Sequence, residues 1–129
     1  MFKDFINWIQ YKVFLNAKSS SPKFKEGEIW WVSFGVNIGS ETDGKNEKFN
    51  RPVLILKKFN RNQFYGLPLT SKEKVNNEFY YELNIKDKKS YVCLTQLRAL
   101  DAKRLQDYYT KIKQSTLEQI KRKFIKLIE

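Results

Sequence analysis

The sequence predicts an α+β fold that is mainly β, a small antiparallel barrel with a helix at each end. Between residues 28 and 97, short aromatic or β-branched runs alternate with polar turns, which is the pattern of strands. Helical spacing of apolar residues occurs only near the two ends of the chain. The 129 residues, 41% of them hydrophobic, suffice for one compact domain with its own core. Because the turns between strands are short, an antiparallel barrel is favoured over a parallel sheet.

Residues 2–15 predict an amphipathic helix. Its apolar positions at helical spacing are Phe2, Phe5, Ile6, Ile9 and Val13, and the face is widened by Trp8, Tyr11, Phe14 and Leu15. Such a helix needs a surface, and we expect it to dock on its own domain; a twin subunit, a partner or a membrane interface are the alternatives. Three serines before Pro22 predict a linker. The chain therefore divides into residues 1–22, the helix and linker, and residues 23–129, the barrel domain.

Five strands are predicted in the barrel domain. They cover Ile29–Phe34, Pro52–Phe59, Gln63–Leu69, Glu78–Leu83 and Ser90–Leu97. Residues 102–112 fit either a short helical turn or a final strand. A last helix is predicted from Ser115, whose spacing from Glu118 matches a capping box. Its apolar face, which we expect to pack on the core, consists of Leu117, Ile120, Phe124 and Leu127.

The composition limits the partners and the kinds of catalysis that the sequence allows. A net charge of +11 and a pI near 9.7 favour a polyanionic partner such as nucleic acid, although a lysine-rich surface that only keeps the protein soluble explains them equally well. The chain has no histidine, which excludes histidine-based acid–base catalysis and argues against zinc. Cys93, the single cysteine, lies in an apolar stretch and is expected to be a buried structural thiol. We expect no metal and no cofactor.

A cytoplasmic location is expected. Charged residues interrupt every apolar run, so no stretch of the sequence is suited to span a membrane. Asn7, Gln10 and Lys12 break what would have to be the apolar core of a secretory signal. A lone cysteine also fits a reducing compartment.

The long polar loop at residues 35–50 is the segment where function is expected. It carries Asn37, Gly39, Ser40, Glu41 and Asp43. The loop leads into Arg51 at the mouth of the second strand, while Thr70 and Ser71 end the third. Because strand ends and their loops gather on one rim of a small barrel, these groups should converge. Taken singly, Arg51, Thr70 and Glu41 have ordinary interpretations as surface, strand-end and loop residues.

Three strings, in order, resemble the MazF/PemK toxin family. They are KEGEIWWVSFGVNIGSETDGKNEKFNRPVLIL, YGLPLTSK and SYVCLTQLRALDAKRL. The resemblance runs from about residue 25 to the C-terminal helix and implies an SH3-like barrel of the CcdB/MazF kind. It also implies the toxin half of a type II toxin–antitoxin pair, which cuts single-stranded mRNA sequence-selectively and without metal. In that reaction the ribose 2′-OH attacks the adjacent phosphate.

The resemblance assigns roles to three residues. Arg51 matches the catalytic arginine of the family, Thr70 its catalytic threonine, and Glu41 a loop glutamate tied to activity in some members. The guanidinium offers a planar fork of donors to phosphate oxygens, and the threonine hydroxyl can donate where charge develops. Glu41 is the candidate general base.

Seven further polar residues are our candidates for RNA contact, namely Asn37, Ser40, Lys45, Lys48, Ser71, Gln96 and Arg98. Lysines in and near the loop should attract the RNA backbone, so binding should weaken as salt rises. Gln96 and Arg98 fit a strand-end hydrogen bond or ion pair equally well. Two departures from the family stand out: the loop between Glu41 and Arg51 is longer than in compact members, and Thr95 stands where many carry an acidic residue.

The resemblance further implies a homodimer that is neutralised by a small antitoxin laid over the RNA groove. An acidic antitoxin segment would complement the +11 charge. Two alternatives keep the fold and change the function. One is a CcdB-type toxin that binds DNA gyrase, although the C-terminal Trp-Gly-Ile ending of that group is absent. The other is a barrel that binds nucleic acid without cutting it.

Overall fold

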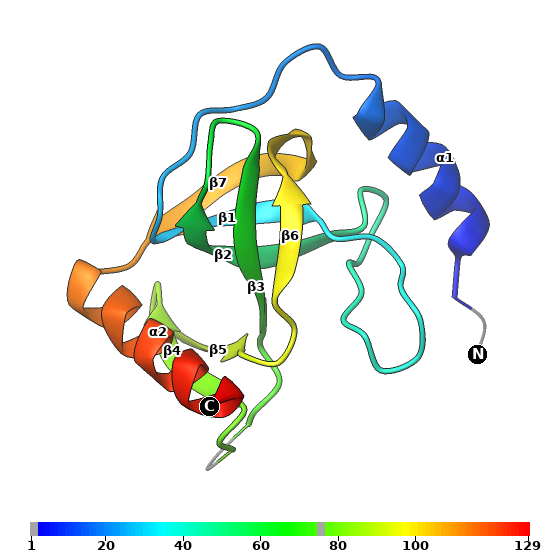
Figure 1. Ribbon diagram of the computed structural model, residues 1–129. Coiled ribbons are helices and arrows are strands. Elements are labelled where there is room, and N and C mark those ends of the chain that lie inside the picture. The colour runs from blue at the N-terminus through cyan, green and yellow to red at the C-terminus, as the bar shows by residue number, and fades with distance from the viewer. Residues whose placement is uncertain (1–2, 75–76) are drawn as a thin grey trace.

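A computed structural model describes residues 3–74 and 77–129 and confirms the predicted fold class. Figure 1 shows antiparallel strands curled into a half-barrel, with one helix at each end of the chain. The elements in chain order are α1 (Phe5–Asn16), β1 (Glu28–Ser33), β2 (Asn50–Lys58), β3 (Gln63–Thr70), β4 (Tyr80–Ile85), β5 (Lys88–Cys93), β6 (Arg98–Asp101), the 3₁₀ turn η1 (Ala102–Arg104), β7 (Leu105–Lys111) and α2 (Gln114–Ile128).

The strand β3 organises the sheet. The strand order is β4-β5-β3-β2-β1-β7, and β6 also pairs with β3. Along one edge β3 pairs with β2; along the other, its first half pairs with β6 and its end with β5. The barrel curls because β3 changes partner in this way, and the sheet on each side of the change encloses a separate core.

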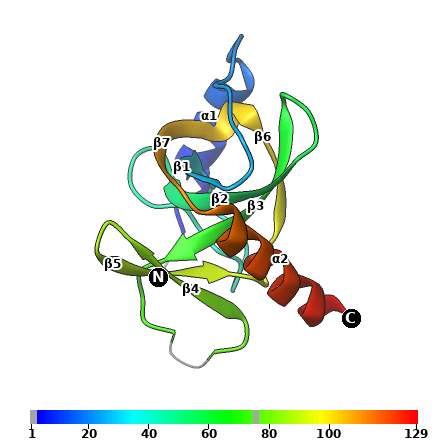
Figure 2. The ribbon, with the colours of Figure 1, turned by 90° about the vertical axis from the view of Figure 1, so that its left-hand side faces the viewer.

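Two apolar clusters fill the barrel. One contains Phe24, Phe34 and Phe64 and lies among β1, β2, β3 and β6. The other lies under α2, where Leu117 and Ile120 pack against residues of β4 and β5, and Figures 1 and 2 show the helix running along these strands. Full burial of such a side chain stabilises the fold by roughly 1.5–3 kcal/mol. The predicted apolar face of the last helix is thus confirmed.

The start of that helix differs from the prediction. The helix begins at Gln114 with Lys113 as its N-cap, and no side chain caps it. The predicted capping box of Ser115 and Glu118 is therefore wrong. Glu118 instead accepts a hydrogen bond from the Gln114 amide across one helical turn, 3.5 Å long. Since β7 pairs with β1 as far as Lys111, the sheet fixes where the chain can turn into the helix.

Strand boundaries differ most near the site. β2 begins at Asn50 rather than Pro52, because Val32 pairs with Arg51 and Ser33 with Asn50, so Arg51 lies inside the strand. The predicted strand Ser90–Leu97 ends at Cys93, and the chain turns before β6. The two strands on either side of the turn pair with different parts of β3, β5 with its end and β6 with its first half. The ambiguous residues 102–112 contain both predicted alternatives in succession, η1 and then β7.

The helix α1 docks on its own domain, as predicted, but through another face. Asp4 caps it by accepting a hydrogen bond from the Asn7 backbone N–H at 3.1 Å. The buried residues are Trp8 and Leu15. The predicted stripe is exposed at four positions, Phe5, Ile6, Ile9 and Val13, while Phe2 lies outside the described residues. Within residues 3–74 and 77–129 no helix combines the length and apolarity needed to cross a bilayer.

Candidate active site

Arg51 and Thr70 stand opposite each other at one end of the β2–β3 hairpin. Val53 pairs with Pro68 in this hairpin, and continuing the register by two residues places Arg51 across from Thr70. The Arg51 guanidinium spans the gap between strand and loop, since Nη1 donates to the Leu69 carbonyl at 3.1 Å and Nε donates to the Asp43 carbonyl. The sheet and the loop therefore both fix its orientation.

The surroundings of Arg51 are partly dry. The side chain is half-buried, and burial lowers the pKa of its guanidinium, while Cys93 and Asp43 act in the opposite direction. Burial raises the pKa of the Cys93 thiol to about 11, so the thiol is neutral at physiological pH. The two hydrogen bonds of Arg51 use two of its five N–H donors, and a phosphate oxygen could accept from the others.

Thr70 is held by the turn that follows β3. Its Oγ1 accepts a hydrogen bond from the backbone N–H of Lys72 at 3.2 Å. That bond fixes the side chain and leaves the hydroxyl proton to be donated elsewhere. Ser71, the next residue, is exposed. The strand end thus presents one oriented hydroxyl beside the Arg51 guanidinium.

The loop over residues 34–49 is closed by its own side chains. Asp43 Oδ1 accepts from the Asn37 backbone N–H at 2.7 Å, and the Asn37 amide donates to the Thr42 carbonyl at 2.8 Å. Glu41 Oε1 accepts from the Ile38 backbone N–H at 2.8 Å. Asn37 and Glu41 consequently stabilise the loop itself, with the exposed Ser40 at its tip.

Gln96 and Arg98 hold the loop through hydrogen bonds to its backbone. Gln96 Oε1 accepts from the Thr42 backbone N–H at 3.1 Å. Arg98 donates to the Phe34 carbonyl at 2.8 Å and its guanidinium lies 4.6 Å from the centroid of the Phe34 ring. Burial lowers the pKa of Arg98, and the nearby Glu41 raises it. Both side chains therefore make structural bonds, and their contact with RNA stays a prediction.

Glu41 lines a hollow of about 400 Å³ whose lining includes neither Arg51 nor Thr70. Its lining consists of Asn37, Glu41, Thr42, Thr95, Gln96, Leu97 and Arg98. In the described part of the chain, no hydrogen bond or ion pair joins Glu41 to Arg51 or Thr70. Lys45 and Lys48 are exposed farther along the loop. The predicted residues thus form two neighbouring groups that share the loop.

Sequence reasoning missed the roles of Asp43 and Lys3. Asp43 joins Asn37 to Arg51, and its Oδ2 forms an ion pair with the Lys3 Nζ at 3.0 Å. Nothing in the sequence around Lys3 indicates that its side chain contacts a loop some 40 positions away. Among residues 3–74 and 77–129, no group of three or more histidine, cysteine, aspartate or glutamate residues could hold a metal ion.

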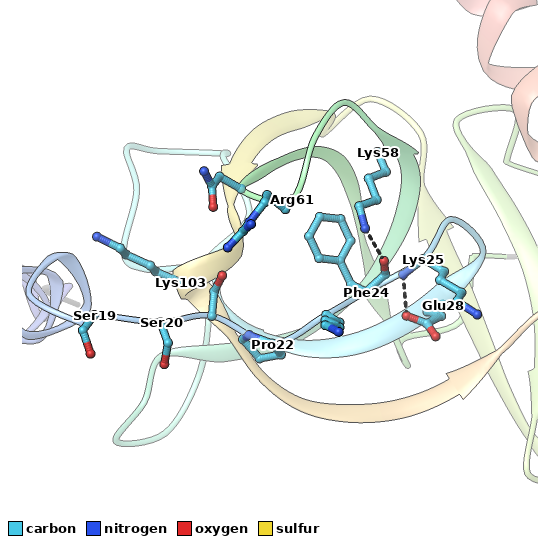
Figure 3. Close-up of a pocket in the computed structure, with 12 residues that line it drawn as sticks. Ser19, Ser20, Pro22, Phe24, Lys25, Glu28, Lys58, Arg61 and Lys103 are labelled. Atoms are coloured by element: carbon cyan, nitrogen blue, oxygen red, sulfur yellow. Dashed lines mark hydrogen bonds between the residues drawn. The ribbon is translucent and has the colours of Figure 1, made fainter.

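A larger hollow, about 590 Å³, lies elsewhere, between the linker after α1 and the turn of the β2–β3 hairpin. Figure 3 shows Arg61 and Lys103 on one side of it and Lys58 on the other, with the Lys58 ammonium donating to the Phe24 carbonyl. Arg51 and Thr70 lie at the opposite end of this hairpin. The arrangement of polar groups, rather than the size of the hollow, therefore locates the candidate active site.

Comparison with known proteins gives a family and a fold. The model of the family described as PemK-like, MazF-like toxin of type II toxin–antitoxin system matches residues 25–128. No curated protein matches. Among solved structures, MazF from Deinococcus radiodurans is 19% identical, with a TM-score of 0.63, covering 85% of this chain and 98% of that one. The MazE–MazF complex of the same organism is 19% identical, with a TM-score of 0.58 and coverages of 85% and 97%. An endoribonuclease from a mycobacterial species is 15% identical, with a TM-score of 0.58 and coverages of 84% and 92%.

Proposed function

The chain belongs to the PemK-like, MazF-like toxins of type II toxin–antitoxin systems, and we propose that it is an endoribonuclease that cleaves single-stranded mRNA sequence-selectively. The observation that carries the proposal is that the half-buried Arg51, bonded to the Leu69 carbonyl, and the oriented hydroxyl of Thr70 lie at the same end of the β2–β3 hairpin. These two side chains offer donors to one small anionic group, and a phosphodiester fits that description.

The proposed reaction needs no metal. The ribose 2′-OH loses its proton and attacks the adjacent phosphorus, and the new O2′–P bond forms as the P–O5′ bond breaks. The departing O5′ takes a proton from water, so the products are a cyclic phosphate and a free 5′-OH. Negative charge grows on the phosphoryl oxygens during this step. The free donors of Arg51 and the hydroxyl of Thr70 are placed to stabilise it, and each such donor contributes about 3–4 kcal/mol in comparable sites.

Glu41 is proposed as the acceptor of the 2′-OH proton. Glu41 lines the smaller hollow and belongs to the loop that Arg51 holds through the Asp43 carbonyl. A nucleotide bound across both groups would bring its ribose near this loop. The exposed residues Ser40, Lys45, Lys48 and Ser71 are proposed to contact the same strand, together with Asn37, Gln96 and Arg98.

An antitoxin is the proposed protein partner. The MazF structure from Deinococcus radiodurans has been solved with MazE, and the family is one of toxin–antitoxin pairs. A net charge of +11 would favour an acidic antitoxin segment. We further propose that the active toxin is a cytoplasmic homodimer.

Substitution of the central pair tests the function. Arg51→Ala and Thr70→Ala should each lower kcat for cleavage of single-stranded RNA by about 100- to 1000-fold, because each removes a donor to the transition state. Cleavage by the wild type should resist chelators and leave cyclic phosphate ends, which mass spectrometry of the fragments detects.

Arg122→Ala is the matched control, because Arg122 is exposed on α2, away from the Arg51 end of the hairpin, and forms an ion pair with Glu118 on its own helix. Its activity should equal that of the wild type. RNA that stays intact with the wild type, or that Arg51→Ala cuts equally well, would overturn the proposal. Growth arrest that persists in Arg51→Ala would instead support a toxin that acts by binding.

A further inference from the structure

The ammonium group of Lys3 is enclosed by a single loop. Its Nζ donates to the Asn37 carbonyl at 2.7 Å and to the Gly39 carbonyl at 3.1 Å, and it lies 3.0 Å from Asp43 Oδ2. A lysine ammonium has three N–H donors, and these three acceptors match them in number. All three acceptors belong to the loop between β1 and β2, so the loop turns around the ammonium as it would around a bound cation.

The helix that follows Lys3 is anchored on the ends of the same loop. Trp8, only 6% exposed, covers Gly35, where an added Cβ would lie 2.4 Å from the indole. The Trp8 and Phe49 rings pack with their centroids 5.4 Å apart. Gly35 and Phe49 are also joined by a backbone hydrogen bond at the base of the loop. Trp8 therefore fixes the base of the loop, while Lys3 fixes its middle.

The loop transmits this restraint to Arg51. The Asp43 carboxylate forms an ion pair with the Lys3 ammonium through Oδ2 and accepts a hydrogen bond from the Asn37 backbone N–H through Oδ1. The carbonyl of the same residue accepts a hydrogen bond from Arg51 Nε. A shift of Asp43 would therefore move the acceptor that orients the guanidinium. Figure 1 shows α1 and this loop on the same side of the barrel.

We propose that Lys3 is a positioning residue for Arg51, and that α1 braces the loop so that the guanidinium is held ready for the phosphate. This inference rests on the proposed nuclease function. The family match begins at residue 25, so it does not cover Lys3 or α1. The physical reason for such a brace is that a long loop loses conformational freedom when it is ordered. A restraint in the free protein removes that cost from the catalytic step.

Kinetics of four variants test the proposal. Lys3→Met should lower kcat by about 10- to 100-fold with little change in KM, because the guanidinium is misplaced while RNA still binds. Lys3→Arg keeps the charge and should recover part of the loss. Asp43→Asn keeps one side-chain oxygen for the Asn37 backbone N–H and the carbonyl that accepts from Arg51 Nε, but an uncharged NH2 replaces the oxygen that faces Lys3. It should therefore resemble Lys3→Met. Lys12→Met, which removes a positive charge from the exposed side of the same helix, is the control and should behave as the wild type.

The double variant Lys3→Met/Asp43→Asn shows whether the two residues act as one unit. If they do, its kcat should be close to that of either single variant, because the second change removes nothing further. Losses that multiply would overturn the proposal. So would a Lys3→Met variant whose kcat equals that of Lys12→Met.

A measurement without RNA separates this proposal from the nuclease function. The Arg51 Nε–H proton, observed by NMR, should exchange with water several-fold faster in Lys3→Met than in the wild type, while amides of β3 exchange unchanged and show that the barrel is folded. Unchanged exchange at Nε would overturn the brace. A wild type that cuts no RNA, together with faster Nε exchange in Lys3→Met, would refute the nuclease and leave the brace standing.

Discussion

The Arg51 side chain is only partly accessible to water, and the Cys93 thiol lies in the same partly dry environment. Cys93 is buried, and burial raises the pKa of its thiol to about 11, although the charges of Arg51 and Lys74 lower it. A neutral thiol is a poor nucleophile. At the scale of single residues, the Cys93 sulfur is therefore part of the packing near the proposed catalytic arginine, as the sequence predicted from the missing histidine.

The Cys93 thiol gives a testable pH dependence of stability. Its folded pKa of about 11 lies above the reference value of 9.0, so the folded state holds the proton more tightly than the unfolded state does. The resulting stabilisation is complete below about pH 9 and is lost as the pH rises through about 11. Urea unfolding at about pH 8 and about pH 10.5 should show a larger loss of unfolding free energy for the wild type than for Cys93→Ala. Equal losses of unfolding free energy in the two proteins would contradict this prediction. Cys93→Ala should still cleave RNA.

The sequence could indicate candidate residues for the chemistry, but not what holds them in place. Arg51 and Thr70 belong to strands whose pairing follows from short turns and alternating patterns, so their position at one end of the hairpin was predictable. The contact of Lys3 with Asp43 depends on the path of a long polar loop without periodicity. No local rule of propensity or spacing encodes such a path.

At the scale of elements, the helix α1 was predicted correctly, but the face predicted to be buried was wrong. Its apolar residues surround most of the helix, so periodicity alone did not decide which side is buried. The barrel decides, because Gly35 leaves a flat site where the Trp8 ring can lie against the backbone. Phe5, Ile6, Ile9 and Val13 then face solvent.

Gly35→Ala should detach α1 from the barrel. Gly35 has φ +93°, which strains any other residue, and its new Cβ would meet the Trp8 ring at 2.4 Å. Strain of about 1–3 kcal/mol and the displaced ring should together lower the unfolding free energy by roughly 3–5 kcal/mol. Chemical denaturation measures this loss, and limited proteolysis should cut the linker at residues 17–22 faster.

Gly39→Ala is the matched control for that change. Gly39 also has a positive φ, +56°, but no atom lies within 4 Å of its added Cβ. It should therefore lose only the backbone strain, about 1–2 kcal/mol, and keep α1 protected from the protease. If the two alanine variants lose equal unfolding free energy, the packing of Trp8 does not depend on the absence of a side chain at Gly35.

At the scale of the whole molecule, two separate basic surfaces could meet RNA. One is the rim of the candidate active site, with Lys45 and Lys48 on the loop. The other is the hollow between the linker and the far end of the hairpin, where Lys23 and Arg61 belong to the lining; Figure 3 shows Arg61 there. Both attract a polyanion, but only the first lies beside Arg51 and Thr70. The net charge of +11 cannot by itself say which surface holds the bound strand.

Salt dependence of binding can separate these two surfaces. In the Thr70→Ala background, where cleavage should be slow enough for binding to be measured, the logarithm of the binding constant should fall linearly with the logarithm of salt concentration. Each lost phosphate contact of a single strand makes the slope shallower by about 0.7. Lys45→Ala/Lys48→Ala should therefore make the slope shallower by about 1.4, whereas Lys23→Ala/Arg61→Ala, an equal loss of charge, should leave it unchanged for an RNA of a few nucleotides. Equal effects of the two pairs would mean that the bound strand also contacts the linker surface, which would refute confinement of RNA to the rim.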